Sequence, residues 1–354
     1  MHFSLLLSLL LPGITSSYNI VDDFSGLDFF DRWDFYGNYD NLTLGDVVWL
    51  DEPTAFEQEL ALVNAAGNVI IKVDNFSNVP FNQKRNSVRI TTQSSYDLGS
   101  LWVIDLVHLP FGCSVWPSIW TLGPDWPNGG EIDIIEGINL MPSNQYALHT
   151  TPGCIHTTPP TQTGNSTLVD CSQPSGCLVG ELAPNSFQSG FAAADGGVYA
   201  AQFDYTGIFI WFWTRSNVPP SIVGSTPTSS IDLSDWGPPS ASYVNTSCPI
   251  EQFFGPQKMV IDITLCGEWA GIPADYQQAC AGAGPTGICY NDNVVGSGAN
   301  YNDAYFEIKS VRTYTTAVPG PSAGVALGGK SNGSGSAFEI WWPWLLAGMM
   351  LTMM

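Results

Sequence analysis

The sequence predicts an all-β fold in which two antiparallel sheets pack face to face, as in a jelly roll. Short runs of β-branched and aromatic residues recur along the chain, and Gly, Pro, Asn and Ser separate them. No long stretch carries the apolar period of an amphipathic helix. The central part of the 354-residue chain, roughly 300 residues long, can bury one substantial core as a single β-sandwich domain.

Six runs are expected to form strands. In chain order they are residues 69–73, 87–91, 101–107, 207–213, 259–263 and 305–311. Trp102, Trp211 and Trp213 lie in these runs and are expected in the core.

Residues 129–137, Gly-Gly-Glu-Ile-Asp-Ile-Ile-Glu-Gly, predict a short acidic strand between glycines. Side chains alternate faces along a strand, so Glu131 and Asp133 share one face while the isoleucines point into the core. Strict alternation would bury Glu136 among the isoleucines, which is too costly for an unpaired carboxylate. A β-bulge at Ile134-Ile135 would return Glu136 to the acidic face, and bulges are common beside active sites.

With this bulge the two glutamates lie about four strand steps apart, which separates their Cβ atoms by roughly 13 Å. Both side chains can lean inward, and a retaining glycosidase needs carboxyl groups ~5–5.5 Å apart. One group attacks the anomeric carbon, and the other protonates the leaving oxygen and then activates water. Asp133 adds a like charge, which raises a neighbour's pKa and keeps one group protonated. The alternative is an acidic strand edge without chemistry; the lack of basic residues from Gly129 to Ala147 disfavours it.

Residues 1–17 predict a signal peptide, because residues 3–11 are apolar and a small-residue site follows at Thr15-Ser-Ser17. The apolar stretch is too short for a membrane span. Sequons of the form Asn-x-Ser/Thr, which suit a glycosylated secreted protein, occur at Asn41, Asn75, Asn165, Asn245 and Asn332. The mature domain is therefore expected over residues 18–316.

The C-terminal end predicts a second processing signal. Residues 317–336 are rich in Pro, Gly, Ala and Ser and indicate a flexible linker, and residues 337–354 are mostly apolar up to the last residue. This order is typical of a GPI-attachment signal, with Asn332, Ser331 or Ser334 as the attachment residue. The alternative is a tail anchor, which Pro343 and the short apolar length disfavour.

Composition excludes several classes of partner. Ten Lys and Arg against 32 Asp and Glu give a formal net charge of −22, which repels nucleic acid and anionic lipid. Only 12% of residues are charged, so a neutral polysaccharide is a suitable ligand, although the acidity could equally serve solubility in an acidic wall. The eight cysteines show no Cys-x-x-Cys spacing, and in a secreted protein they indicate disulfides. Cys171–Cys177 and Cys280–Cys289 are candidate pairs that would close small loops.

Tryptophans gather around the acidic strand. Flat indole rings suit the apolar faces of sugar rings, and Trp116, Trp120 and Trp126 precede the glutamates closely, while Trp269 follows a Cys-Gly-Glu turn. The alternative is core packing, to which aromatic residues contribute generally. For Trp120, Trp126 and Trp269 a place in the cleft is favoured.

Residues 116–137, WPSIWTLGPDWPNGGEIDIIEG, resemble the active-site segment of glycoside hydrolase family 16, and in particular fungal endo-1,3(4)-β-glucanases of the laminarinase type. The segments at residues 85–90, 146–154, 262–271 and 304–314 also resemble that family. The resemblance implies a concanavalin A-like β-jelly roll with glucan lying across a concave sheet. It implies no catalytic metal. No cofactor is expected, and the protein is expected to be a monomer.

Carried over by position, the resemblance implies Glu131 as nucleophile, Glu136 as general acid/base and Asp133 as the residue that orients the nucleophile. His149 would line the cleft near the reacting sugar, whereas without the family it would be read as a hydrogen-bonded sheet histidine. Trp116, Trp120, Trp126, Trp269 and Arg89 are the expected substrate-binding residues.

Three functions compete on this basis. The first is secreted or wall-tethered hydrolysis of β-1,3 or mixed β-1,3/1,4-glucan. The second is transglycosylation, in which a sugar hydroxyl intercepts the same covalent intermediate. The third is a non-catalytic glucan-binding protein, which the presence of both glutamates disfavours.

Overall fold

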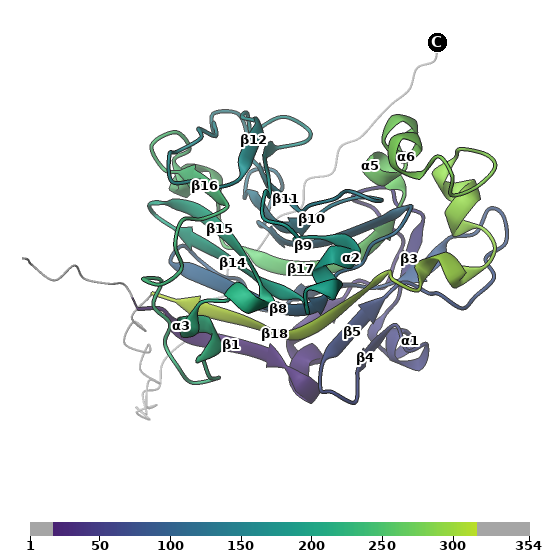
Figure 1. Ribbon diagram of the computed structural model, residues 1–354, viewed down its shortest axis with the longest axis horizontal. Coiled ribbons are helices and arrows are strands. Elements are labelled where there is room, and N and C mark those ends of the chain that lie inside the picture. The colour runs from purple at the N-terminus through teal and green to yellow at the C-terminus, as the bar shows by residue number, and fades with distance from the viewer. Residues whose placement is uncertain (1–16, 317–354) are drawn as a thin grey trace, which may run out of the picture. The chain divides into compact units, whose positions relative to one another are not determined.

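The computed structural model describes residues 17–316, which form two large antiparallel sheets packed face to face (Figure 1). The expected β-jelly-roll sandwich is therefore confirmed. The predictions that fall on residues 1–16 and 317–354, namely the signal peptide, linker and GPI signal, lie outside the described residues. Within residues 17–316 no helix is long and apolar enough to cross a membrane.

The sheet that carries the acidic strand, here called the site sheet, has the order β12-β13-β11-β10-β9-β17-β7-β2. Its strands are β2 (Trp33–Phe35), β7 (Arg89–Thr92), β9 (Val115–Leu122), β10 (Glu131–Glu136), β11 (Gln145–His149), β12 (Asn165–Leu168), β13 (Cys177–Gly180) and β17 (Lys258–Leu265). The acidic strand β10 lies between β9 and β11, away from either edge, so both of its neighbours fix its register.

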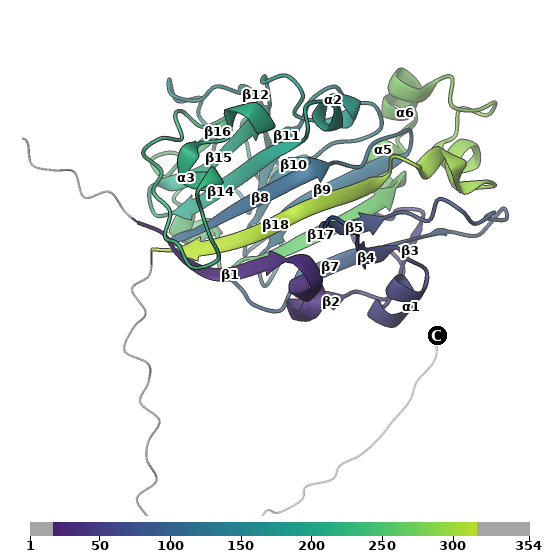
Figure 2. The same cartoon turned by 60° about the horizontal axis from the view of Figure 1, so that its bottom comes forward.

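The second sheet, here called the back sheet, has the order β16-β15-β14-β8-β18-β5-β4, with β1 also paired to β18. Its strands are β1 (Asn19–Ser25), β4 (Ala61–Val63), β5 (Val69–Lys72), β8 (Ser100–His108), β14 (Gly197–Asp204), β15 (Gly207–Thr214), β16 (Ala241–Val244) and β18 (Tyr305–Thr315). The first strand, β1, thus lies beside the last, β18 (Figure 2). This pairing joins the two ends of the described chain.

Short elements connect the strands. A parallel pair forms from β3 (Val47–Trp49) and β6 (Arg85–Ser87). The helices are α1 (Glu52–Glu57), α2 (Gln188–Ala193), α3 (Pro220–Val223), α4 (Ile250–Phe253), α5 (Gly267–Ala270) and α6 (Pro273–Cys280), with the 3-10 turns η1 (Gly26–Arg32), η2 (Arg215–Asn217) and η4 (Gly298–Tyr301) and the π-helical turn η3 (Tyr290–Val294). All of the described helices are short, as expected from the absence of a long helical period.

The six expected strands are all present, with one difference. The expected run 87–91 divides at Val88 into β6, which pairs with β3, and β7, which joins the site sheet. Val88 itself is fully buried. The run divides there because its two halves pair with different strands, which a single run of alternating residues cannot reveal.

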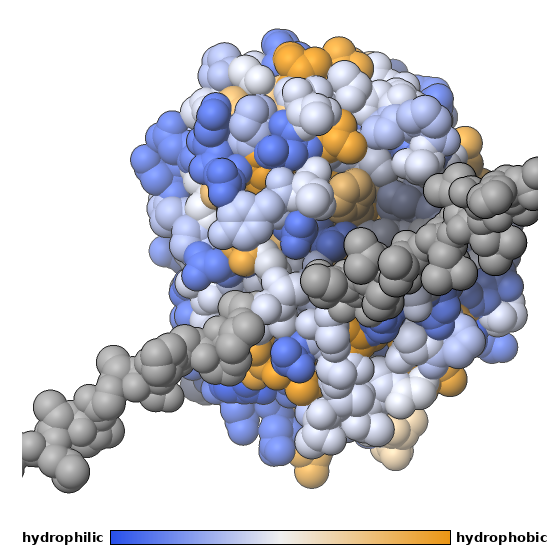
Figure 3. All heavy atoms as spheres, turned by 90° about the vertical axis from the view of Figure 1, so that its left-hand side faces the viewer, coloured by the Kyte–Doolittle hydropathy of each residue, from blue (hydrophilic) through white to orange (hydrophobic). Residues whose placement is uncertain are grey.

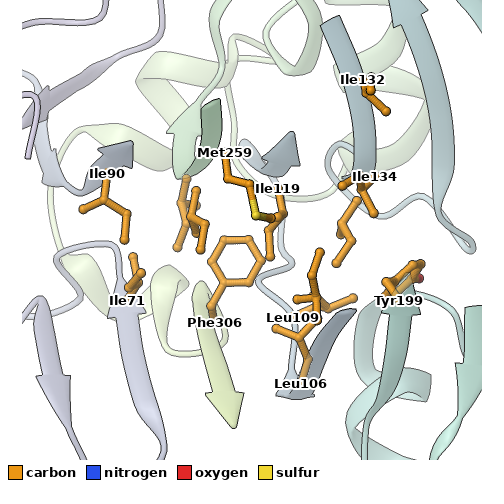
Figure 4. Packing of buried hydrophobic residues seen from close by; sticks show 14 of the residues in the cluster. Ile71, Ile90, Leu106, Leu109, Ile119, Ile132, Ile134, Tyr199, Met259 and Phe306 are labelled. Carbon is orange, nitrogen blue, oxygen red and sulfur yellow. The ribbon is translucent and has the colours of Figure 1, made fainter. Parts of the chain in front are cut away.

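The core lies between the two sheets (Figure 4). Ile90, Ile119, Ile134 and Met259 of the site sheet face Ile71, Leu106, Tyr199 and Phe306 of the back sheet, and each is fully buried. Trp102 belongs to the same core, as expected, and stacks against Phe203 with ring centroids 6.1 Å apart. The strands therefore hold the acidic face of β10 in place by packing its opposite, isoleucine face.

A second apolar cluster covers the outer face of the back sheet. Trp211 of β15 is almost buried there by Trp236, whose ring centroid lies 5.2 Å away, and by Ile222 and Ile231 from the same crossing segment. Trp213 is partly buried against this cluster. Trp211 and Trp213 are thus packed, as expected, but against the outer face and not between the sheets.

Four disulfides pair all eight cysteines: Cys113–Cys280, Cys154–Cys248, Cys171–Cys177 and Cys266–Cys289. The expected Cys171–Cys177 pair is present, and the expected Cys280–Cys289 pair is wrong. Cys280, the last residue of α6, is bonded to Cys113 just before β9, 167 residues away in sequence, and Cys289 is bonded to Cys266 just after β17. Closeness in sequence was a poor guide because tertiary packing brings the distant cysteines together.

The face shown in Figure 3 is mostly hydrophilic, with hydrophobic residues scattered over it. This agrees with a chain of low charge content, whose surface must be largely uncharged and polar.

Replacing Trp102 by Ala is expected to lower the free energy of unfolding by about 3–5 kcal/mol, because a fully buried indole is removed and a cavity remains. Denaturant unfolding of the two proteins measures the difference. Leu27→Ala is the control, because Leu27 is 84% exposed and its truncation is expected to change stability by less than about 0.5 kcal/mol. Equal stability of Trp102→Ala and the parent would show that this core assignment is wrong.

Candidate active site

The acidic strand β10 contains the expected β-bulge. Opposite β11, Asp133 pairs with Ala147 and Glu136 pairs with Gln145, so Ile134 and Ile135 together oppose the single residue between them. A register shift at the same place occurs against β9. Both isoleucines are fully buried, whereas Glu131 and Glu136 are only partly buried. The extra residue therefore places both glutamates on the acidic face with Asp133.

The three carboxyl groups interact, and each has a raised pKa. Burial, followed by repulsion from Asp133, raises the pKa of Glu131 to about 8. Burial is also the main cause that raises the pKa of Asp133 to about 7 and that holds the pKa of Glu136 well above its ordinary value. Asp133 and Glu131 both add repulsion at Glu136. One face of one strand thus holds three acids whose pKa values all lie above the ordinary carboxyl range, and such shifts allow acid and base roles side by side.

Two of the expected tryptophans donate hydrogen bonds to the two glutamates. The Trp116 Nε1–H donates to Glu136 Oε1 at 2.9 Å, and the Trp126 Nε1–H donates to Glu131 Oε2 at 2.5 Å. Trp126 is 55% exposed, and Trp269 of α5 packs edge-on against Trp116 with ring centroids 5.4 Å apart. The structure therefore places Trp116 of β9 and Trp126 of the β9–β10 loop on the two glutamates, and it brings Trp269 of the distant α5 against Trp116.

His149 lies on β11 directly opposite Glu131. Its Nε2 is 3.4 Å from Asp133 Oδ2, and its side chain is 16% exposed. Gly176, with φ of +67°, passes over the ring: a Cβ added there would lie 3.0 Å from His149 Nε2. Glu131, Asp133 and His149 offer ligand atoms that all lie within 4.8 Å of one another, so this is the described group that could hold a metal ion. Such a donor set also occurs without a metal, and the carboxyl chemistry below needs none.

Trp120 and Arg89 form the floor beside the carboxyl groups. Trp120 pairs with Asp133 across β9 and β10 and so shares its face, but it is only 8% exposed. Its Nε1–H donates to Asp262 Oδ1 at 3.2 Å. The Arg89 guanidinium lies over the Trp120 ring at 5.9 Å and over the Tyr36 ring at 4.8 Å. Trp120 is thus mostly buried beneath the carboxyl groups, and it offers less surface to a ligand than its expected place in the cleft implied.

Asp262 was not predicted as a site residue, although its segment was recognised. It lies on β17 beside Arg89 and opposite Ser118 of β9. Burial raises its pKa to about 7 against the opposing effect of Arg89, and its charge in turn raises the pKa of Asp133. The sequence signal was an acid within an otherwise apolar strand, which places a carboxyl group on the same face as Trp120.

Asn144 was also missed. It is 1% exposed and lies immediately before β11. Its side chain accepts a hydrogen bond from the Glu136 backbone N–H at 2.9 Å and donates one to the Ile134 carbonyl at 3.0 Å. The predicted bulge already implied that backbone groups near it would lack ladder partners, so a polar side chain close by was to be expected.

Replacing Asp133 by Asn is expected to move both limbs of the kcat/KM pH profile to lower pH. With the roles that the family resemblance implies, the rising limb would report ionisation of Glu131 and the falling limb would report loss of the proton from Glu136. Repulsion from Asp133 raises both pKa values, so its removal lowers both. Both limbs should still lie above the ordinary pKa range of a carboxyl group, because burial, which Asp133→Asn does not change, is the larger cause of the two raised pKa values. Asp28→Asn, on an exposed residue, is the control, and limbs that stay fixed or move upward would contradict the assignment.

The β-sandwich presents two carboxyl groups on one face of a central strand, an arrangement that suits a glycoside hydrolase. Residues 33–314 match the family model of the XgeA-like catalytic domains of glycoside hydrolase family 16. The chain belongs to that family.

Individual relatives agree with this assignment. The chain is 36% identical over 305 residues to a probable glycosidase of Schizosaccharomyces pombe, covering 84% of this chain and 69% of that protein. It is 33% identical to the endo-1,3(4)-β-glucanase xgeA of Emericella nidulans, covering 87% of this chain. The chain spans about half the length of that relative, 49%.

Two solved structures are similar over 84% of this chain and 100% of theirs. One is the family 16 laminarinase 16A of Phanerochaete chrysosporium, which holds β-glucans in its donor and acceptor sites and matches with a TM-score of 0.78 and 32% identity. The other is an elongating family 16 β-1,3-glucosyltransferase, with a TM-score of 0.78 and 36% identity. The two neighbours represent hydrolysis and transfer on the same fold.

Proposed function

We propose that this protein is a retaining endo-β-glucanase that hydrolyses β-1,3-glucan and mixed β-1,3/1,4-glucan. The single observation that carries the proposal is the bulged strand β10, which presents Glu131 and Glu136 on one face with Asp133 between them. The laminarinase and endo-1,3(4)-β-glucanase relatives support the substrate class.

The proposed reaction gives the two glutamates the two roles of a retaining glycosidase. In the first step the Glu131 carboxylate attacks the anomeric carbon and forms a covalent glycosyl-enzyme, while the Glu136 carboxyl gives its proton to the leaving glycosidic oxygen. In the second step Glu136, now ionised, takes a proton from water, and the water oxygen displaces Glu131. The sugar therefore keeps its configuration at the anomeric carbon after two inversions.

Neighbouring groups assist each glutamate. The Trp126 indole N–H stabilises charge on Glu131, and the Trp116 indole N–H holds the Glu136 carboxyl in one orientation. Asp133, 2% exposed, orients Glu131 and, with His149, adjusts the charge beside it. The rings of Trp116, Trp126 and Trp269 are at least partly exposed and supply flat apolar surface for glucose units. Trp116 and Trp269 lie on the Glu136 side of the bond that is cleaved, and Trp126 lies on the Glu131 side.

Transglycosylation is the second candidate, favoured by the similarity to the elongating β-1,3-glucosyltransferase. The covalent intermediate is the same, and the acceptor is a sugar hydroxyl in place of water. The balance between the two depends on how firmly the acceptor side holds a second glucan relative to water.

Product analysis on laminarin and on mixed-linkage glucan tests the proposal, with Glu131→Ser as the inactive comparison. Short oligosaccharides from the parent support hydrolysis, and their relative rates report linkage preference. Products longer than the substrate support transfer. Glucan binding without any product, unaffected by the substitution, would show that the chain is a glucan-binding protein and would overturn the enzymatic proposal.

We further propose that residues 1–17 direct secretion, that residues 18–316 are the catalytic domain of a monomer, and that residues 317–354 carry a linker and a GPI signal. The sequons at Asn41, Asn165 and Asn245 are exposed, which suits glycosylation in the secretory route. Release of the protein from intact cells by a phosphatidylinositol-specific phospholipase tests the anchor, and full recovery of the untreated protein in the medium would contradict it.

A further inference from the structure

We infer that Asn144 is a positioning residue for the general acid/base: its carboxamide replaces one peptide unit of the β10–β11 ladder and so fixes the bulge that turns Glu136 into the active site. This inference rests on the proposed function. It concerns a residue that makes no contact with the reacting atoms and acts only through the backbone of Glu136.

The bulge creates the need for such a residue. Because Ile134 and Ile135 together oppose one residue of β11, the regular ladder cannot satisfy every backbone group at this point. A buried backbone N–H or carbonyl without a partner costs about 1–3 kcal/mol. The strand would avoid that penalty by sliding into regular register, and a one-residue slip turns every following side chain to the opposite face.

The Asn144 side chain satisfies both groups at once. Its Oδ1 accepts from the Glu136 N–H at 2.9 Å, and its Nδ2 donates to the Ile134 carbonyl at 3.0 Å. A carboxamide presents one acceptor and one donor side by side, as a backbone peptide does. Asn144 therefore makes the pair of ladder bonds that the bulge removes, one residue before β11 begins.

The backbone of Asn144 is itself held on both sides. Its N–H donates to Ser186 Oγ at 3.1 Å, and its carbonyl accepts from the Glu181 N–H at 2.9 Å. Asn144 is 1% exposed and Ser186 is fully buried. The segment that leads from β13 into α2 thus supports Asn144, and Asn144 supports the bulge. Within residues 17–316 the Glu136 carboxyl, in contrast, accepts one side-chain hydrogen bond, from the Trp116 indole. The orientation of that carboxyl therefore depends on its backbone.

The test uses the full chain and two substrates that differ in leaving group. Laminarin needs proton donation by Glu136, whereas 2,4-dinitrophenyl β-laminaribioside has a leaving group that departs without it. The value of kcat/KM reports steps up to the glycosyl-enzyme. For Asn144→Leu, which keeps the size but removes both bonds, we expect kcat/KM on laminarin to fall about 100-fold and on the aryl glycoside less than about 5-fold.

Glu136→Ala gives the reference signature, and Asn144→Leu should share it, including recovery of aryl glycoside turnover with azide. Asn293→Leu is the matched control, because Asn293 is also 1% exposed with two side-chain hydrogen bonds but lies in η3. If Asn144→Leu does not fold, Asn144→Asp replaces it. That variant keeps the acceptor for the Glu136 N–H, loses the donor, and adds a like charge, so its falling pH limb should move upward.

The outcomes separate the two claims. A parent that turns over neither substrate overturns the proposed function and this inference with it. An active parent with equal losses on both substrates for Asn144→Leu, or with no loss, overturns the inference alone. A large loss on laminarin with the aryl glycoside spared, absent from Asn293→Leu, supports it, and an Asn144→Asp pH profile that stays unchanged would contradict it.

Discussion

Replacing Glu131 by Gln is expected to lower the turnover of β-glucan by at least about a thousandfold, because the amide cannot form the covalent glycosyl-enzyme. Substrate binding should persist, since the tryptophans and Arg89 are unchanged. Reducing-sugar release from laminarin measures the loss, and equilibrium binding of a laminarin oligosaccharide measures what remains. Turnover within about tenfold of the parent would remove Glu131 from the nucleophile's role.

The same substitution should raise thermal stability at pH 7. Burial raises the pKa of the Glu131 carboxyl to about 8, so the folded state holds a proton that the unfolded state has released. Stability is therefore lost as pH rises from the ordinary carboxyl pKa to about 8, and an amide avoids this loss. At pH 7 we expect Glu131→Gln to melt about 2–5 °C higher than the parent. At pH 4 we expect the two proteins to melt at the same temperature, because the carboxyl group is then protonated in both the folded and the unfolded state. Glu57→Gln, on an exposed residue of α1, should show no such change.

Replacing Glu136 by Ala is expected to produce a loss that depends on the leaving group. On β-glucan the first step loses proton donation, and kcat/KM should fall about 10²–10⁴-fold. On the dinitrophenyl glycoside kcat/KM should change little, while kcat falls because water is no longer activated. Added azide, which needs no base, should restore kcat and give a β-glycosyl azide, since the configuration is retained.

This signature distinguishes Glu136 from Glu131. Glu131→Gln should lose activity on β-glucan and on the dinitrophenyl glycoside to the same extent, because each substrate must form the covalent intermediate on that residue. Recovery of Glu131→Ala by azide with an α-configured product would confirm the opposite side of attack. Equal losses of activity of Glu136→Ala on both substrates, with no effect of azide, would show that another group has the acid/base role. Asp133 would then be the next candidate.

The site could be predicted to different depths from the sequence. The alternation of isoleucine and acid in residues 129–137 predicted the bulge, because the only regular alternative buried Glu136 among isoleucines; the structure has that bulge. His149 needed the family resemblance, since a lone histidine carries no sign of its neighbour. The hydrogen bonds from Trp116 and Trp126 to the two glutamates depend on the paths of β9 and the loop after it, which spacing does not encode.

What the sequence determined by itself about this protein is its local chemistry. Short β-branched runs fix an all-β sandwich, and the penalty for burying a carboxylate fixes the face of Glu136. What only the tertiary structure decided is which distant groups meet: Cys280 with Cys113, Trp120 with Asp262, and Asn144 with the Glu136 backbone. The physical reason is that local preferences act between neighbours along the chain, whereas these contacts arise when separate strands pack and must satisfy one another's buried polar groups.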